Sequence, residues 1–196
     1  MSYKKLLVVT LLLVIFQGVA HAEKLHIKKI PSGDTLLLND GRSVQLIGVD
    51  SKMVKARYAQ LGPAKAGAPH KVYNSGESFI ADTAGEASID IELDEAFAKN
   101  NHMNSNGNLL GYVYINVPEE IWSAFDHTAT IPQVIVGYEF MDDQFIYDKK
   151  THRIFLNASL IWSGNGDVDK TQPFKYAEKF IQYEEEAKLK GKGQWQ

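Results

Sequence analysis

The chain has 196 residues, no cysteine, and 21 basic against 24 acidic side chains, which gives a formal net charge of −3 at pH 7. The lack of cysteine excludes a disulfide-stabilised scaffold, a zinc–thiolate site and a cysteine nucleophile. A hydrophobic content of 44% with 11% aromatic residues excludes the composition of a disordered chain. We therefore expect a folded protein that depends on its hydrophobic core.

The first 22 residues have the pattern of a signal peptide. Two lysines precede the apolar run Leu6–Phe16, and Ala20 and Ala22 have the spacing of a cleavage site. The run is shorter than the roughly 20 apolar residues of a membrane-spanning helix. We therefore expect residues 1–22 to be removed on export to the periplasm or the medium, which leaves residues 23–196 as one domain without a stable membrane span. An uncleaved anchor is the alternative.

The mature chain is mildly acidic, because removal of the leader leaves 19 basic against 24 acidic side chains and a formal charge of −5. This balance argues against nucleic-acid binding through bulk positive charge, so any recognition of phosphate has to be local. The sequence contains no Walker loop, no GxGxxG and no HExxH motif. Common nucleotide-binding and zinc-protease signatures are therefore missing.

Residues 25–50 have the alternation of antiparallel strands. Leu36 and Leu38 are two residues apart before the dipeptide Asp40-Gly41, and Val44 and Leu46 are two residues apart after it. Asp-Gly is a preferred two-residue hairpin turn. The segment is therefore predicted to be a β-meander.

A basic segment follows at residues 52–76. It contains several glycines and prolines and no acidic residue. Its five cations are Lys52, Lys55, Arg57, Lys65 and Lys71. We expect a mobile basic loop with these side chains as anion-binding candidates, and a solvated linker is the alternative.

The middle of the chain predicts a helix followed by two strands. Residues 77–87 favour a short helix with Ser75 as its N-cap. Residues 89–94 alternate apolar and acidic side chains, which is typical of a strand with its carboxylates toward solvent. After a polar turn at residues 104–108, the β-branched and aromatic residues of 109–115 suit another strand.

The last third of the chain contains an aromatic-rich segment and two predicted helices. Residues 116–155 look like one or two additional hairpins, and residues 156–161 begin a helix. The final helix shows the clearest periodicity, because apolar residues recur at i, i+4, i+7 and i+11 before Gly191. These positions are Tyr176, Phe180, Tyr183 and Ala187.

Five stretches together resemble the staphylococcal nuclease (thermonuclease) family. The first two are the acidic motifs Ser-Gly-Asp-Thr at 32–35 and Val-Gln-Leu-Ile-Gly-Val-Asp-Ser at 44–51. Three further stretches agree in order and character, namely Asn106–Tyr114, Leu156–Ala158, and Glu184–Lys190 with Gly193-Gln194-Trp195. The resemblance covers residues 25–115 and 156–195.

This resemblance implies an α+β fold that is mainly β. Its centre would be a five-stranded, OB-like Greek-key barrel capped by helices, with a long C-terminal helix. Residues 116–155 have no counterpart in short family members, so they are expected to form an insertion with an extra β-hairpin. The resemblance thus predicts one nuclease-like domain from residue 23 to residue 196.

The resemblance also assigns the site residues. In active members two aspartates and a threonine carbonyl hold Ca²⁺, a glutamate activates water and two arginines bind the scissile phosphate. Asp34, Asp50 and Ser51 stand at the calcium-binding positions, and calcium favours such oxygen ligands. As an alternative, both aspartates cap turns through their short acceptor side chains.

The remaining three family positions hold residue types that differ from those of active members. Gln45 replaces the first arginine, Met53 replaces the glutamate and Asn108 replaces the second arginine. A general base contributes about 10²- to 10⁴-fold to a rate, and one electrostatic donor about 10²- to 10³-fold. The resemblance therefore implies a protein that has lost catalysis, unless groups from residues 52–57 or 77–82 have taken over.

Three functions are compatible with these observations. The leading hypothesis is an exported, non-catalytic binding module that holds a polyanion, a nucleic acid or a protein partner at the barrel mouth. The second is a Ca²⁺-dependent nuclease with relocated catalytic groups, and the third is an envelope protein that binds a partner through residues 116–155. Four tyrosines could provide stacking faces for bases. They are Tyr112, Tyr114, Tyr138 and Tyr147.

Overall fold

The computed structural model describes residues 24–61, 75–119 and 143–196. Several predicted features lie outside these ranges, namely the signal peptide, Lys65, Lys71 and the aromatic residues between 120 and 142. What the sequence predicts for them stays a prediction. In the three described ranges, no helix has the length and hydrophobicity that would let it cross a membrane.

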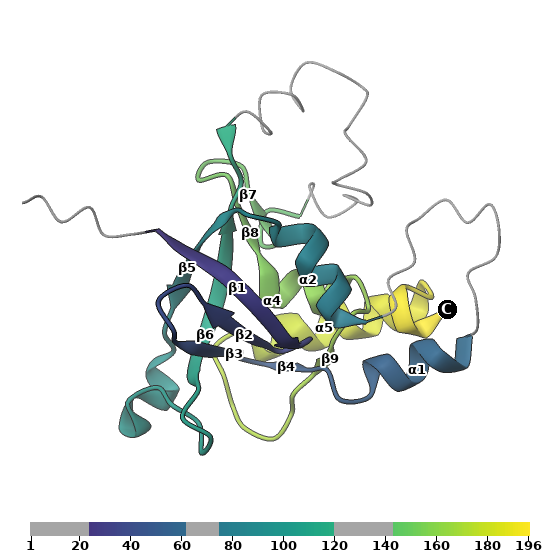
Figure 1. Cartoon of the computed structure of the whole chain (residues 1–196). Helices are drawn as coiled ribbons and strands as arrows, with labels where there is room; N and C mark the ends of the chain where they lie inside the picture. Colours follow the sequence, from purple (N-terminus) through teal and green to yellow (C-terminus); the bar gives the residue numbers. More distant parts are fainter. Residues whose placement is uncertain (1–23, 62–74, 120–142) are drawn as a thin grey trace, which may run out of the picture.

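The strands, with the labels of Figure 1, are β1 (Leu25–Ser32), β2 (Thr35–Leu38), β3 (Ser43–Leu46), β4 (Val49–Asp50), β5 (Ser88–Glu92), β6 (Leu109–Asn116), β7 (Tyr147–Asp148), β8 (Arg153–Phe155) and β9 (Asp167–Val168). The helices are α1 (Val54–Leu61), α2 (Gly76–Ala84), α4 (Leu156–Trp162) and α5 (Ala177–Leu189), with short 3₁₀ helices η1 (Glu95–Asn100) and η4 (Gly193–Trp195).

Five strands close into a barrel. Antiparallel pairs join β3 to β2, β2 to β1, β1 to β5 and β5 to β6, and a parallel pair between β3 and β6 closes the ring. The helices pack around this barrel, with α4 and α5 side by side behind β1 in Figure 1. The prediction of a mainly β, α+β fold built on a five-stranded barrel is confirmed.

The hairpin predicted around Asp40-Gly41 is present between β2 and β3. Side chains on these strands alternate, and Leu36, Leu38 and Val44 are fully buried. Thr35, Leu37, Ser43 and Gln45 alternate with the buried residues and belong to the outer face. The barrel interior and its outer surface are therefore both defined by the two-residue period.

The core extends from the barrel to α4 and α5. Phe180, Tyr183 and Ala187 of the predicted C-terminal stripe are buried. The chain passes close to this helix at Gly48, whose φ is +76°. A Cβ atom there would lie 2.6 Å from the Phe174 ring and 3.0 Å from Phe180, so only glycine fits both the backbone and the space.

Helix α1 corrects the prediction of a mobile loop over residues 52–76. Val54 and Tyr58, one helical turn apart, are buried against the domain and give residues 54–61 a face to pack. The glycines and prolines that suggested a loop begin only at Gly62. At the other end of the segment, Ser75 caps α2 by accepting a hydrogen bond from the Ser78 N–H, as predicted.

The described ends of the 116–155 insertion join the barrel. Strands β7 and β8 form a short antiparallel hairpin, and β8 extends the sheet by pairing with β6. Asp143 accepts a 2.6 Å hydrogen bond from the Tyr183 hydroxyl on α5. The prediction of an extra hairpin is therefore confirmed for residues 147–155.

Candidate functional site

The two acidic motifs meet at one end of the barrel, here called the mouth. The Asp34 carboxylate accepts hydrogen bonds from the Ser32 hydroxyl at 2.6 Å and the Thr35 hydroxyl at 3.0 Å, both on Oδ1. Its Oδ2 accepts the Ser51 N–H at 3.3 Å. The turn between β1 and β2 approaches so closely that a Cβ on Gly33 would lie 2.9 Å from Ser51 Cβ.

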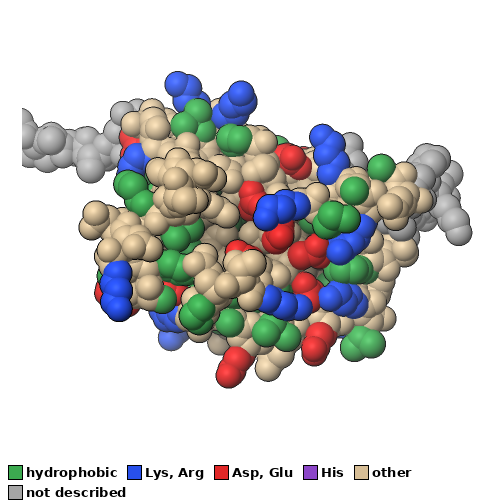
Figure 2. All heavy atoms as spheres, turned by 90° about the horizontal axis from the view of Figure 1, so that it is seen from below, with side chains coloured by type: hydrophobic (Ala, Val, Ile, Leu, Met, Phe, Trp, Pro, Cys, Tyr) green, Lys and Arg blue, Asp and Glu red, His purple; other side chains and the backbone are tan. Residues whose placement is uncertain are grey.

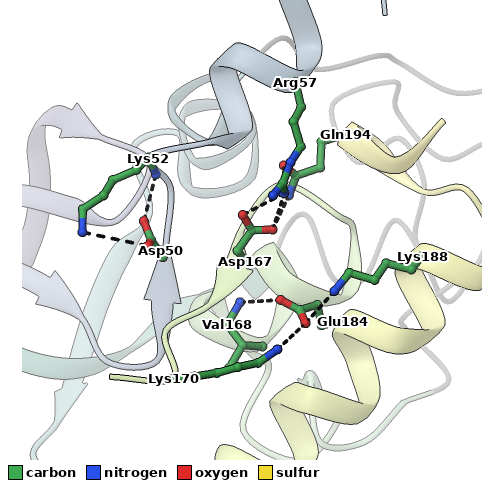
Figure 3. Close-up of polar contacts among 9 residues, drawn as sticks. All are labelled: Asp50, Lys52, Arg57, Asp167, Val168, Lys170, Glu184, Lys188 and Gln194. Carbon is green, nitrogen blue, oxygen red and sulfur yellow. Dashed lines mark hydrogen bonds and ion pairs between the residues drawn. The ribbon is translucent and has the colours of Figure 1, made fainter. Parts of the chain in front are cut away.

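Asp50 ends β4, directly before the turn that leads into α1. Its Oδ1 accepts the Lys52 N–H at 2.9 Å, and its Oδ2 lies 3.9 Å from Lys52 Nζ (Figure 3). The Ser51 carbonyl accepts the Val54 N–H at 3.2 Å and so joins the turn to the first residue of α1. Each of the three calcium-position residues therefore already has a local structural role at the mouth.

Calcium usually requires six to eight oxygen ligands. The family positions supply two carboxylates and one carbonyl, and all three accept hydrogen bonds from the chain. Within residues 24–61, 75–119 and 143–196, no group of three or more His, Asp or Glu side chains is arranged to hold a metal ion. The donor set of the family positions is too small to hold calcium without several waters.

Gln45 stands where the family has its first arginine, and its neutral amide contacts another amide. Gln45 lies on β3 between Thr35 of β2 and Leu110 of β6. Its Oε1 accepts a hydrogen bond from Asn104 Nδ2. Asn104 Oδ1 in turn accepts the backbone N–H groups of residues 106 and 108 at 2.8 and 3.0 Å. The contact therefore stabilises a turn and provides no fixed charge for a phosphate.

The other two substituted positions are also uncharged. Asn108 is half-buried at the end of the 104–108 turn, directly before β6. Met53 is 53% exposed in the turn before α1, where the family has its glutamate. A thioether cannot accept a proton from water at neutral pH, so no general base stands at this position.

Arg57 is the arginine of α1, and its side chain points toward Asp167 and Gln194 (Figure 3). Its Nη1 lies 2.8 Å from both oxygens of Asp167 and 2.9 Å from Oε1 of Gln194. The guanidinium also lies 4.4 Å from the centre of the Trp195 ring. Arg57 therefore joins α1 to β9 and to the C-terminal η4, and anion binding by this side chain would require these contacts to open.

Asp167 is the cross-strand neighbour of Asp50 in the small β4–β9 sheet. Burial raises the pKa of the Asp167 carboxyl, the hydrogen bonds and charge of Arg57 oppose this effect, and the charges of Glu184 and Asp50 add to it. The positive charge of Arg57 is therefore needed to offset a local excess of carboxylates. Sequence reasoning missed this ion pair because its members are 110 residues apart.

The other described cations of the basic segment, Lys52 and Lys55, lie at the surface. The Lys52 side chain is 83% exposed and Lys55 is exposed on α1. Figure 2 shows acidic and basic side chains next to one another across the face seen from below, so this face carries both signs of charge.

A second cluster near the mouth was also missed. Glu184 on α5 is 4% exposed and accepts hydrogen bonds from the Val168 N–H and from the ammonium groups of Lys170 and Lys188 (Figure 3). Burial raises the pKa of Glu184, but these three donors lower it to about 2. The cluster fixes the chain after β9 against α5, which positions Asp167.

At most one or two of the four candidate tyrosines are expected to offer stacking faces, because most aromatic residues of strands belong to the core. Tyr112 and Tyr147 are buried, so neither offers one. Tyr112 donates a 2.6 Å hydrogen bond to Asp94, and burial together with this carboxylate raises its pKa. Tyr114 is half-buried and donates to Glu92 at 2.8 Å, and Tyr138 lies outside the described residues.

The acidic residues at the end of β5 and just after it take part in contacts that a two-residue alternation does not predict. Asp94, expected in solvent, is 6% exposed and accepts hydrogen bonds from Tyr112 and from the backbone N–H groups of Ala96 and Lys175. Glu92 accepts the Lys175 ammonium at 2.7 Å. Both carboxylates hold the segment before α5 against the barrel.

No protein-family model matches this sequence, and no curated protein matches it either. The resemblance to the nuclease family therefore stays a prediction from the five sequence stretches.

Proposed function

We propose that this protein is an exported, nuclease-like module that binds a phosphate-bearing polyanion without cleaving it. The order β1–β2–β3–β6–β5 around the closed barrel supports an OB-like, Greek-key description, and OB folds commonly bind extended polymers. The OB-like description and the binding of polymers are implied by the resemblance, and export is inferred from the signal-peptide pattern of residues 1–22.

One observation carries the non-catalytic part of the proposal. Where the family places an arginine, Gln45 accepts a hydrogen bond from Asn104, and the first arginine after the second acidic motif, Arg57, is paired with Asp167. No single donor replaces both a bidentate arginine and a general base. Loss of the arginine lowers the reaction rate by about 10²- to 10³-fold, and loss of the base by about 10²- to 10⁴-fold. These factors do not multiply, because catalytic groups act as a unit.

A Ca²⁺-dependent nuclease with relocated groups is the second candidate. Two contacts favour it. The Ser51 N–H donates to Asp34, which brings the two acidic motifs together. Arg57 contacts Asp167, which pairs with Asp50 across the β4–β9 sheet. In this candidate, Arg57 would leave Asp167 to contact a phosphate. The envelope-protein hypothesis depends mainly on residues 120–142, which the structure does not describe.

A cleavage and binding assay separates the candidates. The chain of residues 23–196 is incubated with a fluorescent single-stranded oligonucleotide in Ca²⁺ or EDTA, and products are resolved on a gel while anisotropy reports binding. We expect binding in both buffers and no cleavage. Calcium-dependent cleavage that disappears in Asp34→Ala and Asp50→Ala would establish the nuclease instead, and failure to bind any polyanion would remove the proposed function.

A further inference from the structure

Strand β1 exposes two consecutive lysines, Lys28 and Lys29. Successive side chains of a regular strand point to opposite faces, so two neighbours on the outer face require an irregularity. The pairing with β2 contains two register shifts, and the first lies between Ile27 and Lys29. Ile27 is opposite Leu38 and Lys29 is opposite Leu37, so two steps on β1 correspond to one step on β2.

This irregularity is a β-bulge at Lys28, and it determines where both lysines point. Ile27 and Ile30 both pack against the core although they are three residues apart, which a regular two-residue period does not allow. The extra residue restores Ile30 to the inner face and leaves Lys28 and Lys29 outside. The bulge therefore converts adjacent positions of one strand into a pair of outward-facing cations.

These two lysines differ from Lys52 and Arg57 at the mouth. Lys52 and Arg57 lie within 4.0 Å of a carboxylate. Among the described residues, neither Lys28 nor Lys29 has such a partner, and both are exposed. An arriving anion would not have to displace an acid from them, so their full charge is available to it.

The neighbouring outer-face residues are neutral, and all of them except Leu37 have side chains that can form hydrogen bonds. Lys29 is in register with Leu37, which is in register with Ser43. The next outward row on β2 and β3 contains Thr35 and Gln45. The outer face of β1, β2 and β3 thus combines two cations with a serine, a threonine and an amide.

We propose that the outer face of β1, β2 and β3 binds the phosphate backbone of single-stranded nucleic acid, with Lys28 and Lys29 as the phosphate contacts. Ser43 and Gln45 provide hydrogen-bonding groups beside the path of the strand. This inference rests on the proposed polyanion-binding function and moves its site from the mouth to β1. Binding is electrostatic and independent of base identity, because backbone contacts carry no sequence information.

Nucleic acid fits this face better than a lipid surface. Peripheral membrane binding usually combines cations with apolar side chains that enter the bilayer. In the described ranges, the large exposed apolar residues lie on other segments. They are Met53, Leu93, Met103 and Leu189. The β1 face offers charge and hydrogen bonds without an apolar wedge.

The test compares two lysine pairs with the same sequence. In the 23–196 chain, Lys28→Ala/Lys29→Ala removes the pair on β1, and Lys149→Ala/Lys150→Ala removes an exposed pair from the β7–β8 turn. Both variants lose the same net charge. Affinity for a fluorescent oligothymidylate is measured by anisotropy between about 50 and 200 mM salt. Thermal melts confirm that both variants fold.

Each phosphate contact on a single strand contributes about −0.7 to the slope of log K against log salt, so loss of the β1 pair should flatten the slope by about 1.4. We expect roughly tenfold weaker binding at the lowest salt for the β1 variant and wild-type values for the turn variant.

Equal effects of the two variants, or none, would overturn the β1 site while leaving the polyanion function in place. Wild-type protein that binds no oligonucleotide would refute the nucleic-acid assignment, and failure to bind any polyanion would remove both proposals. Binding to anionic phospholipid vesicles without binding to the oligonucleotide would assign the face to a membrane and refute the nucleic-acid assignment.

Discussion

Asn157 is predicted to be the most costly polar side chain to remove from this fold. It is fully buried at the start of α4 and contacts the β6 backbone at the point where its strand partner changes. Strand β3 pairs with residues 109–111 of β6, and β8 pairs with residues 114–116. Val113 lies between these two ladders, and its N–H donates to Asn157 Oδ1 at 2.9 Å.

The magnitude follows from the backbone groups that Asn157→Ala leaves unpaired. Asn157 Nδ2 donates to the Ile47 carbonyl at 2.9 Å and to the Gly111 carbonyl at 3.2 Å. The Gly111 carbonyl keeps the Ile47 N–H at 3.1 Å, so two groups, Val113 N–H and Ile47 C=O, lose their partner. At about 1–3 kcal/mol for each buried unsatisfied group, the variant should lose about 2–6 kcal/mol of unfolding free energy.

Urea unfolding of the 23–196 chain, followed by circular dichroism, measures this loss as a lower midpoint with an unchanged m-value. For a domain of this size the melting temperature should fall by about 2–4 °C per kcal/mol. Ser159→Ala is the matched control, because Ser159 is equally buried but donates only to the nearby Leu156 carbonyl. A loss below about 1 kcal/mol for Asn157→Ala, or equal losses for both variants, would refute the bridging role.

Three other substitutions test the contacts around the mouth. In Glu184→Gln, the free energy of unfolding should fall less than in the wild type as the pH drops from 4.5 toward 2. The wild type should lose up to about 3 kcal/mol there, because its folded-state pKa is lowered to about 2, and urea melts across this range measure the difference. Arg57→Lys keeps the charge but loses the planar guanidinium that contacts Asp167, Gln194 and the Trp195 ring together. A thermal melt should therefore show a loss of about 1–2 kcal/mol, and an unchanged melt would contradict this role. Lys175→Met removes the ammonium contact with Glu92, so limited proteolysis should cut residues 169–176 faster; an equal rate would speak against this anchoring role.

Elements with a local periodic signal could be predicted from the sequence. The stripe that contains Phe180, Tyr183 and Ala187 identifies the buried face of α5, because helical spacing alone puts these side chains together. The Asp40-Gly41 turn likewise fixes the hairpin of β2 and β3. In both cases the information lies within about a dozen neighbouring residues.

The bulge in β1 has a local signal that a search for strict alternation passes over. Ile27 and Ile30 are one residue out of phase, and the two lysines between them mark the shift. An extended segment whose apolar residues change from spacing two to spacing three is a sign of an inserted residue. The β1 surface could have been found from that pattern, whereas composition directed attention to residues 52–76.

The environment of the mouth could not have been predicted, because it depends on distant pairings. The β4–β9 sheet brings Asp167 beside Asp50, and only this pairing explains why Arg57 turns to β9. No nearby sequence feature distinguishes Arg57 from a solvated cation. The same is true of Asp94, whose three hydrogen-bond donors come from different parts of the chain.

The partners of each cation, more than the number of cations, determine where this protein can hold an anion. A phosphate at Arg57 would have to separate it from Asp167, whose carboxylate is only 16% exposed and lies beside Asp50. Breaking a buried pair leaves an uncompensated charge and costs about 3–5 kcal/mol, and the fractional exposure of this pair reduces that figure without removing it. At Lys28 and Lys29 no such cost arises among the described residues, so even the modest attraction of surface charges is a net gain. A weak, salt-sensitive site on β1 is therefore favoured over a site at the mouth.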